Sequence, residues 1–101
     1  MKVLILGFET KEEIDAEMEK IMQEGECYLF SVVCGDQVGA SYEWAEWRGA
    51  PVVLEKPRQP QDLVNMADYL VVKIGKAAPA WLKNLVMQWK AAGKHGYVIR
   101  G

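Results

Sequence analysis

Five short apolar runs lie along the 101-residue chain, and each is long enough for one strand. Most lack the alternation of polar and apolar residues found in a strand with one wet face. This pattern is typical of strands that are buried on both faces of a parallel sheet. The expected strands are Lys2–Leu6, Tyr28–Val33, Pro51–Leu54, Tyr69–Ile74 and Tyr97–Ile99.

Segments with helical periodicity separate these runs. The first begins with the capping box Thr10-Lys11-Glu12-Glu13 and places apolar residues on one stripe and carboxylates on the other. Pro79 lies where a helix start tolerates proline, and Gly93 ends the last helical segment. The expected helices are Lys11–Glu24, Ala40–Trp47, Gln61–Ala67 and a segment from Pro79 to about Ala92.

Strands that alternate with helices across short connections predict a single Rossmann-like domain over residues 1–101. We expect a three-layer α/β/α architecture around a five-stranded, mainly parallel sheet with strand order 3-2-1-4-5. Such a sheet binds ligands beyond the carboxyl ends of its strands, near the point where the strand order reverses. The loops at that end are residues 7–10, 34–41, 55–60 and 75–79.

Composition argues against several classes of function. The formal net charge of −2 disfavours a nucleic-acid coat and a binder of anionic membranes, which normally carry a basic excess. The apolar run Val3–Leu6 is too short for a secretory or membrane segment, so we expect a cytoplasmic protein. Cys27, Cys34 and His95 have no zinc-ligand spacing, and the sequence predicts neither a metal nor a cofactor.

The second loop is the strongest candidate for binding an anion. Gly35 and Gly39 allow close approach of the backbone, and the amides at the following helix start, from Ala40, attract negative charge. Ser41 adds a hydroxyl, and Asp36 lies where an acid could bind a ribose hydroxyl. The alternative is a plain connection with glycine turns, a solvated Asp36 and Ser41 as helix cap.

The first and fourth loops are weaker candidates. Gly7 and the amides of the first helix could hold a phosphate, but a tight turn at Gly7 with Thr10 as a helix cap is favoured, because the nearby glutamates Glu9, Glu12 and Glu13 would repel an anion. Gly75 and Lys76 could neutralise a phosphate in the fourth loop, or Lys76 could be a solvated loop lysine. Glu9 and Glu43 are the only acids that we consider as general acids.

Four tryptophans are a large number for a domain of this size. The spacing predicts that Trp44 and Trp47 share one helix face and that Trp81 and Trp89 share another. Because the core offers little room for all of them, we expect at least one to lie at a subunit contact or to cover a ligand base. We favour the subunit contact, which predicts a homodimer through a helix face.

The glycine pattern also resembles the second-loop motif of the SLOG superfamily of Rossmann-like domains. The motif residues are Gly35, Gly39, Ala40, Gly49, Pro51 and Val52, with Trp44-Ala45 between them. The segments Asn65–Val72 and Lys90–Ile99 are similar to the fourth-strand and C-terminal motifs of that superfamily. The resemblance covers most of the chain and implies a fold that binds a nucleotide or a nucleotide derivative.

Two departures from the superfamily bear on activity. The first loop has Gly7-Phe8-Glu9 in place of the usual Gly-Ser-Arg, and the fourth keeps only Gly75 of a glycine-rich motif. The leading hypothesis is therefore a non-enzymatic binder or sensor of phage or mobile-element origin. In it Gly7 and Phe8 shape a wall for a base or ribose. The alternatives are a phosphoribohydrolase-like enzyme that acts on nucleoside monophosphates and an interaction module with a degenerate site.

Overall fold

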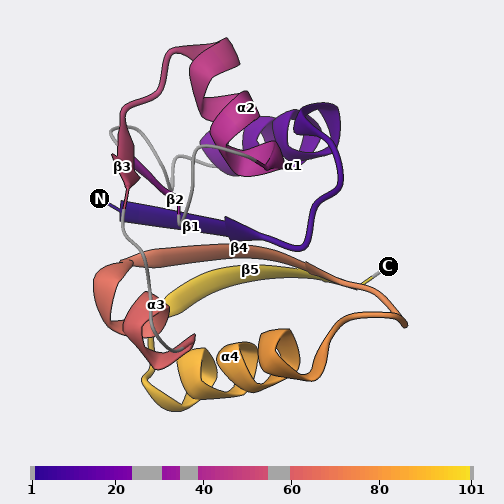
Figure 1. Ribbon diagram of the computed structural model, residues 1–101, viewed down its shortest axis with the longest axis vertical. Helices are drawn as coiled ribbons and strands as arrows, with labels where there is room; N and C mark the ends of the chain where they lie inside the picture. The colour runs from indigo at the N-terminus through magenta and orange to yellow at the C-terminus, as the bar shows by residue number, and fades with distance from the viewer. Residues whose placement is uncertain (1, 24–30, 35–38, 55–59, 101) are drawn as a thin grey trace.

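The computed structural model of the chain describes residues 2–23, 31–34, 39–54 and 60–100. Figure 1 shows helices on both sides of one twisted sheet, which confirms the expected α/β class. The elements are β1 (Lys2–Leu6), α1 (Lys11–Gln23), β2 (Ser31–Cys34), α2 (Ala40–Arg48), β3 (Val52–Leu54), α3 (Pro60–Met66), β4 (Tyr69–Ile74), α4 (Ala80–Ala91) and β5 (His95–Arg100).

The sheet has the order β3-β2-β1-β4-β5, and every neighbouring pair is parallel. The predicted strand order is therefore confirmed. β1 lies at the centre, where Val3 is in register with Val32 of β2 and with Tyr69 of β4. Asp68, which precedes β4, fixes the start of the pairing between β1 and β4. Its carboxylate accepts a hydrogen bond from the Lys2 amide, and its own amide donates to the Lys2 carbonyl, both at 2.8 Å.

The strand and helix boundaries differ slightly from those predicted. β5 begins at His95 rather than Tyr97, because His95 and Gly96 pair with Tyr69 and Leu70 of β4 although neither is a strong strand former. Residues 28–30 of the expected second strand, and Glu24 at the expected end of the first helix, lie outside the described residues.

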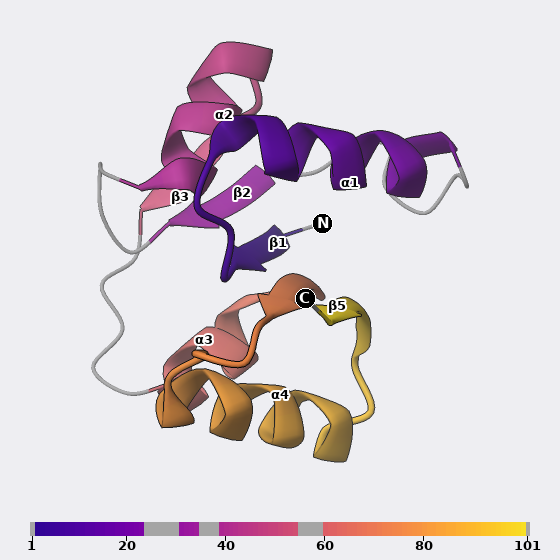
Figure 2. The same cartoon turned by 90° about the vertical axis from the view of Figure 1, so that its right-hand side faces the viewer.

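Two hydrophobic layers hold the helices against the sheet. α1 and α2 cover one face, and α3 and α4 cover the other (Figures 1 and 2). Successive strand residues point to opposite faces. In β1, Val3 and Ile5 therefore join the layer under α1, whereas Leu4 joins the layer over α4. The sequence pattern of unbroken apolar strands thus reflects burial on both sides.

Each tryptophan pair is divided between the core and the surface. Trp44 and Trp89 are 1% and 2% exposed, whereas Trp47 and Trp81 are 53% and 46% exposed. Residues three and eight apart are rotated by about 60° and 80° around a helix, so the members of a pair can lie on one broad face and still differ in burial. That rotation is enough to carry Trp47 and Trp81 out of the buried stripe.

Candidate functional site

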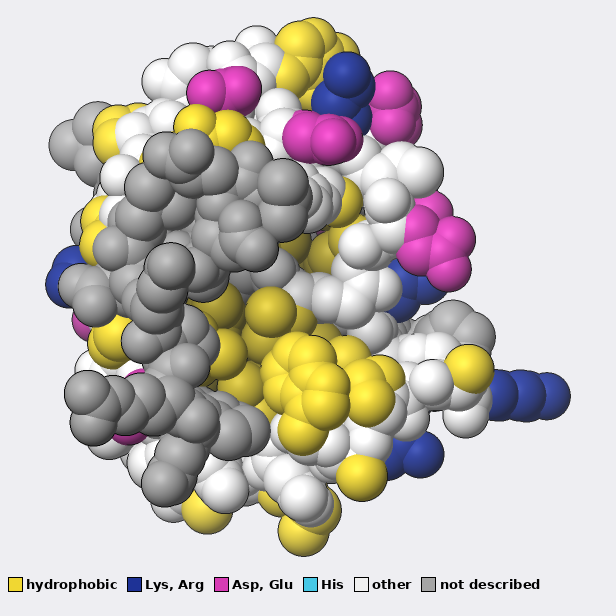
Figure 3. Space-filling model, viewed as in Figure 1, with side chains coloured by type: hydrophobic (Ala, Val, Ile, Leu, Met, Phe, Trp, Pro, Cys, Tyr) yellow, Lys and Arg dark blue, Asp and Glu magenta, His cyan; other side chains and the backbone are white. Residues whose placement is uncertain are grey.

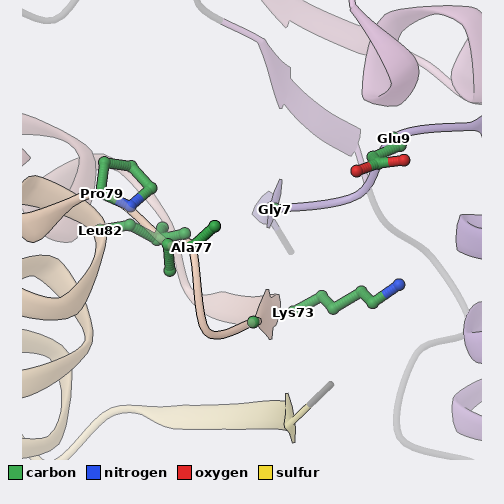
Figure 4. A pocket seen from close by; sticks show the side chains of 8 residues that line it. Gly7, Glu9, Lys73, Ala77, Pro79 and Leu82 are labelled. Carbon is green, nitrogen blue, oxygen red and sulfur yellow. The ribbon is translucent and has the colours of Figure 1, made fainter.

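A pocket lies beyond the carboxyl ends of β1 and β4, at the point where the strand order reverses. From β1 the chain runs outward through β2 to β3 and then returns to β4 on the other side of β1. Parallel sheets bind ligands at such a switch point. The pocket has a volume of about 240 Å³ and is lined by Gly7, Glu9, Lys73, Gly75, Ala77, Ala78, Pro79 and Leu82 (Figure 4).

Gly7 lets the two central strands close up at this end of the sheet. Its φ of +83° is in the region that favours glycine, and a Cβ placed there would lie 2.1 Å from the Lys73 carbonyl oxygen. No side chain fits at that distance. Gly7 is therefore required by the packing of β1 against β4, which supports the tight-turn interpretation, and it also forms part of the pocket wall.

Lys73 and Glu13 form an ion pair beside the pocket. The Lys73 ammonium donates to a Glu13 carboxylate oxygen at 2.8 Å, and both side chains are about one-third exposed. This hydrogen bond, followed by the charge of Glu13, raises the pKa of Lys73 above its ordinary value of 10.5. The charges of Glu9 and Glu17 act in the same direction and contribute less.

The same ion pair changes the capping box predicted at the start of α1. The Glu13 amide donates to the Thr10 hydroxyl at 3.3 Å, so Thr10 caps the helix as expected. The reciprocal half of the box would turn the Glu13 carboxylate back to the Thr10 amide. Instead that carboxylate binds Lys73, because a charged donor from β4 is a stronger partner than a solvent-exposed amide.

One side of the pocket is consequently acidic. Glu9 lines it, and the charge of Lys73 is already matched by Glu13. Figure 3 shows further acidic side chains over the part of the molecule that contains α1 and α2. A phosphate placed on this side would meet a net negative field, whereas a hydroxyl or an N–H group would find a carboxylate acceptor.

The opposite side of the pocket is apolar and belongs to the connection between β4 and α4. Figure 4 shows Ala77, Pro79 and Leu82 across the opening from Glu9 and Lys73. The Ala78 amide donates to the Gly75 carbonyl at 3.2 Å, and the Leu82 amide donates to the Pro79 carbonyl at 3.1 Å. Two turns thus hold this wall in place, and it suits the flat apolar face of a ring.

Some of the predicted site residues meet in this pocket and others do not. Gly7, Glu9 and Gly75 line it. Lys76 is exposed and is not among the lining residues, and Phe8 packs against the hydrophobic layer under α1. Lys73 was missed by the sequence analysis. Its signal is a lysine near the end of an otherwise apolar strand, YLVVKI.

The second loop is described only from Gly39 onward, so Gly35 and Asp36 lie outside the described residues. Gly39 is the N-cap of α2 with a φ of +109°, and as a glycine it makes no side-chain cap hydrogen bond. Ser41 as the helix cap is therefore wrong, because the helix begins one residue before it. Ala40 is partly buried against the core.

The other candidate acid and the histidine lie away from the pocket. Glu43 is exposed on α2 and does not line the pocket. His95 is the first residue of β5 and therefore lies at the amino end of the sheet. Within the described ranges, no group of three or more His, Cys, Asp or Glu side chains could hold a metal ion.

No protein-family model, curated protein or solved structure matches the chain. Among the helices of the described segments, none is long and apolar enough to span a bilayer. The features of the described residues that bear on function are the pocket between β1 and β4 and the chemistry of its two sides.

Proposed function

We propose that the protein binds a nucleotide or nucleotide derivative and that the pocket at the ends of β1 and β4 takes the nucleoside part. The observation that supports this proposal is a pocket at the switch point of a parallel sheet, with an apolar wall facing a carboxylate. The volume of about 240 Å³ is below the usual range for whole-ligand pockets, which fits one ring system of a larger ligand.

The two sides of the pocket suit the two halves of a nucleoside. A base would lie against Ala77, Pro79 and Leu82, and the Glu9 carboxylate would accept hydrogen bonds from ribose hydroxyls. The phosphate groups of the nucleotide would lie outside the pocket, away from its acidic side. The start of α2, from Gly39 to Ser41, is the backbone anion site that the sequence favours for them. Membership of the SLOG superfamily is proposed on the sequence motifs alone.

The test is thermal unfolding of the protein with a panel of nucleosides, nucleoside monophosphates and nucleoside triphosphates. A ligand at about 100 times its Kd should stabilise the fold by about 2.7 kcal/mol. Ala77→Phe fills the pocket and should abolish the shift, whereas Ala91→Phe at the far end of α4 should retain it. The proposal fails if no member of the panel changes the unfolding temperature of the wild type.

The phosphoribohydrolase-like alternative is supported by one observation, namely that Glu9 lines the pocket. An enzyme of this class should release free base from a nucleoside monophosphate. Glu9→Gln should abolish the release, and Glu12→Gln, an exposed carboxylate on the first turn of α1, is the matched control. Stabilisation by nucleosides without base release supports the binder over the enzyme.

The interaction-module alternative is supported by the exposed indoles of Trp47 and Trp81. Figure 3 also shows hydrophobic side chains gathered in the lower half of one face. This alternative would be favoured if the wild type binds no nucleotide but binds a protein partner, and if Trp47→Ala or Trp81→Ala no longer binds that partner.

A further inference from the structure

The two outer strands of the sheet are protected very differently. β3 has three residues and follows Pro51, so it offers a short edge. β5 has six residues, and each one from His95 to Arg100 is in register with a residue of β4. Among the described residues no strand pairs with the outer side of β5, which lies at the margin of the sheet in Figure 2.

Natural proteins usually shield a free edge with a short strand, a proline, a lysine, a bulge or a covering segment. β3 has two of these devices. β5 contains neither proline nor lysine, and its unbroken register with β4 excludes a bulge. Its charged residue, Arg100, lies at the last position of the strand and leaves the apolar stretch Tyr97–Ile99 without a charge. Its outer row of backbone N–H and C=O groups is therefore a template for another strand.

The side chains of β5 are also incompletely buried. Tyr97 packs against the hydrophobic layer under α1, and Val98 packs against the layer over α4. Tyr97, Val98 and Ile99 nevertheless all remain partly exposed, whereas the first four residues of β4 are buried. A strand added beside β5 would cover apolar surface on both faces of the sheet.

We propose that a second copy of this chain occupies this edge, with the two β5 strands antiparallel across a two-fold axis. The surface then meets itself, as a symmetric dimer requires. Side chains directly opposite each other in an antiparallel pair point to the same face. The axis must therefore pass midway between one residue of β5 and the same residue of the second copy, so that this residue is opposite itself.

Side-chain matching selects the position of the axis. With the axis at Val98, Val98 faces its own copy, Tyr97 faces Ile99 of the second copy, and Gly96 faces Arg100 of the second copy. Aromatic residues opposite β-branched ones are favourable cross-strand pairs. An axis at Tyr97 would instead place His95 opposite Ile99, so the Val98 axis is preferred.

α4 lies against β5 within each copy. The Trp89 indole N–H donates to the His95 carbonyl at 2.9 Å, and a Cβ on Gly96 would lie 3.0 Å from the Trp89 Nε1 atom. The axis is perpendicular to the sheet, so the two copies of α4 lie on the same face and flank it. Strand pairing over five residues is a small interface, and we expect the dimer to dissociate on dilution.

Amide hydrogen exchange of the wild-type protein tests the proposal without a mutation. In a monomer, β4 bonds only alternate amides of β5, so protection alternates along the strand. In the dimer, the remaining amides between Gly96 and Arg100 should also be protected at millimolar concentration and lose that protection at low micromolar concentration. Alternating protection at every concentration would overturn the proposal.

Sedimentation of two matched variants gives a second, independent test. Val98→Lys places a charge on the axis, and Val53→Lys places the same charge on a half-buried position of the opposite edge strand. Val98→Lys should be monomeric, and Val53→Lys should dimerise like the wild type. A wild type that stays monomeric at millimolar concentration, or a dimer that Val53→Lys disrupts and Val98→Lys does not, would contradict the proposed edge.

Discussion

The helices on the two faces of the sheet are fastened in different ways. On the α1 and α2 face, the Trp44 indole N–H donates to the Asp15 carboxylate at 3.0 Å. Arg48 binds the same carboxylate at 3.3 Å and the Glu19 carboxylate at 2.7 Å. The acceptors between these helices are therefore carboxylate side chains that are partly exposed to water.

On the α3 and α4 face, the acceptors are backbone carbonyls. The Trp89 indole donates to the His95 carbonyl at 2.9 Å. The Lys94 ammonium donates to the Ala67 carbonyl at 2.8 Å and to the Val64 carbonyl, at the end of α3, and it lies 5.2 Å from the centre of the Trp89 ring.

This difference has a physical consequence. Carboxylates near water are screened by salt and can rotate to other partners, whereas a carbonyl is held in place by its helix or strand. The α3 and α4 face should therefore be the more rigid one. The acidic side of the pocket belongs to the adaptable face, through Glu9 and Glu13, and the apolar wall belongs to the rigid one.

The largest expected effect is common to both faces. Trp44→Ala and Trp89→Ala should each lower the free energy of unfolding by about 3–5 kcal/mol, because each removes a buried indole from a closed layer. Chemical denaturation measures both. A loss below about 2 kcal/mol at either position would show that its layer can collapse into the cavity.

Replacing the cationic side chains Lys94 and Arg48 should affect the free energy of unfolding differently on the two faces of the sheet. Lys94→Met should cost about 1.5–3 kcal/mol, because a charged donor to two helix-end carbonyls is lost, and the loss should change little with salt. Arg48→Met should cost about 0–1 kcal/mol at low salt and less at high salt, since its side chain is 38% exposed. Denaturation at two ionic strengths decides this. Equal salt dependence of the two variants would contradict the comparison.

The indole hydrogen bonds should differ by a smaller amount. Trp89→Phe leaves the His95 carbonyl without its indole donor, whereas Trp44→Phe leaves Asp15 with Arg48. Both changes shorten the side chain by the same atoms. We therefore expect Trp89→Phe to be the more destabilising by about 1 kcal/mol, measured as the difference between the two free energies of unfolding.

The smallest effect concerns Lys73 and pH. Its pKa is raised in the folded protein, so its pairing with Glu13 stabilises the fold fully below pH 10.5 and is lost as the pH rises through the higher folded value. The thermal stability of the wild type should therefore fall more steeply above pH 10.5 than that of Lys73→Met. If the thermal stabilities of the two proteins fall in parallel as the pH rises, the Lys73–Glu13 pair does not stabilise the fold.

Much of the fold was predictable from local patterns. Apolar runs such as YLVV in β4 predicted strands that are buried on both faces, and Gly49 and Gly93, both at positive φ, end helices near the expected positions. The boundaries of β5 were not predictable, because His95 and Gly96 become strand only through their pairing with β4.

The candidate site was predictable only in part. The sequence placed Gly7, Glu9 and Gly75 at the ligand-binding end of a parallel sheet, and all three line the pocket. It did not place Lys73 there, because a lysine within a strand has no local signal for the helix that it will meet. It also did not show that Lys76 lies outside the pocket lining.

The sequence by itself determined the order of elements, the parallel sheet and the loops that lie at the carboxyl end of that sheet, because these follow from periodicity and chain connectivity. The tertiary structure decided which tryptophans are buried, why Gly7 must be glycine and that Glu13 binds Lys73 instead of closing its own helix cap. Each of these depends on a distance between residues far apart in the chain, and no local pattern encodes such a distance.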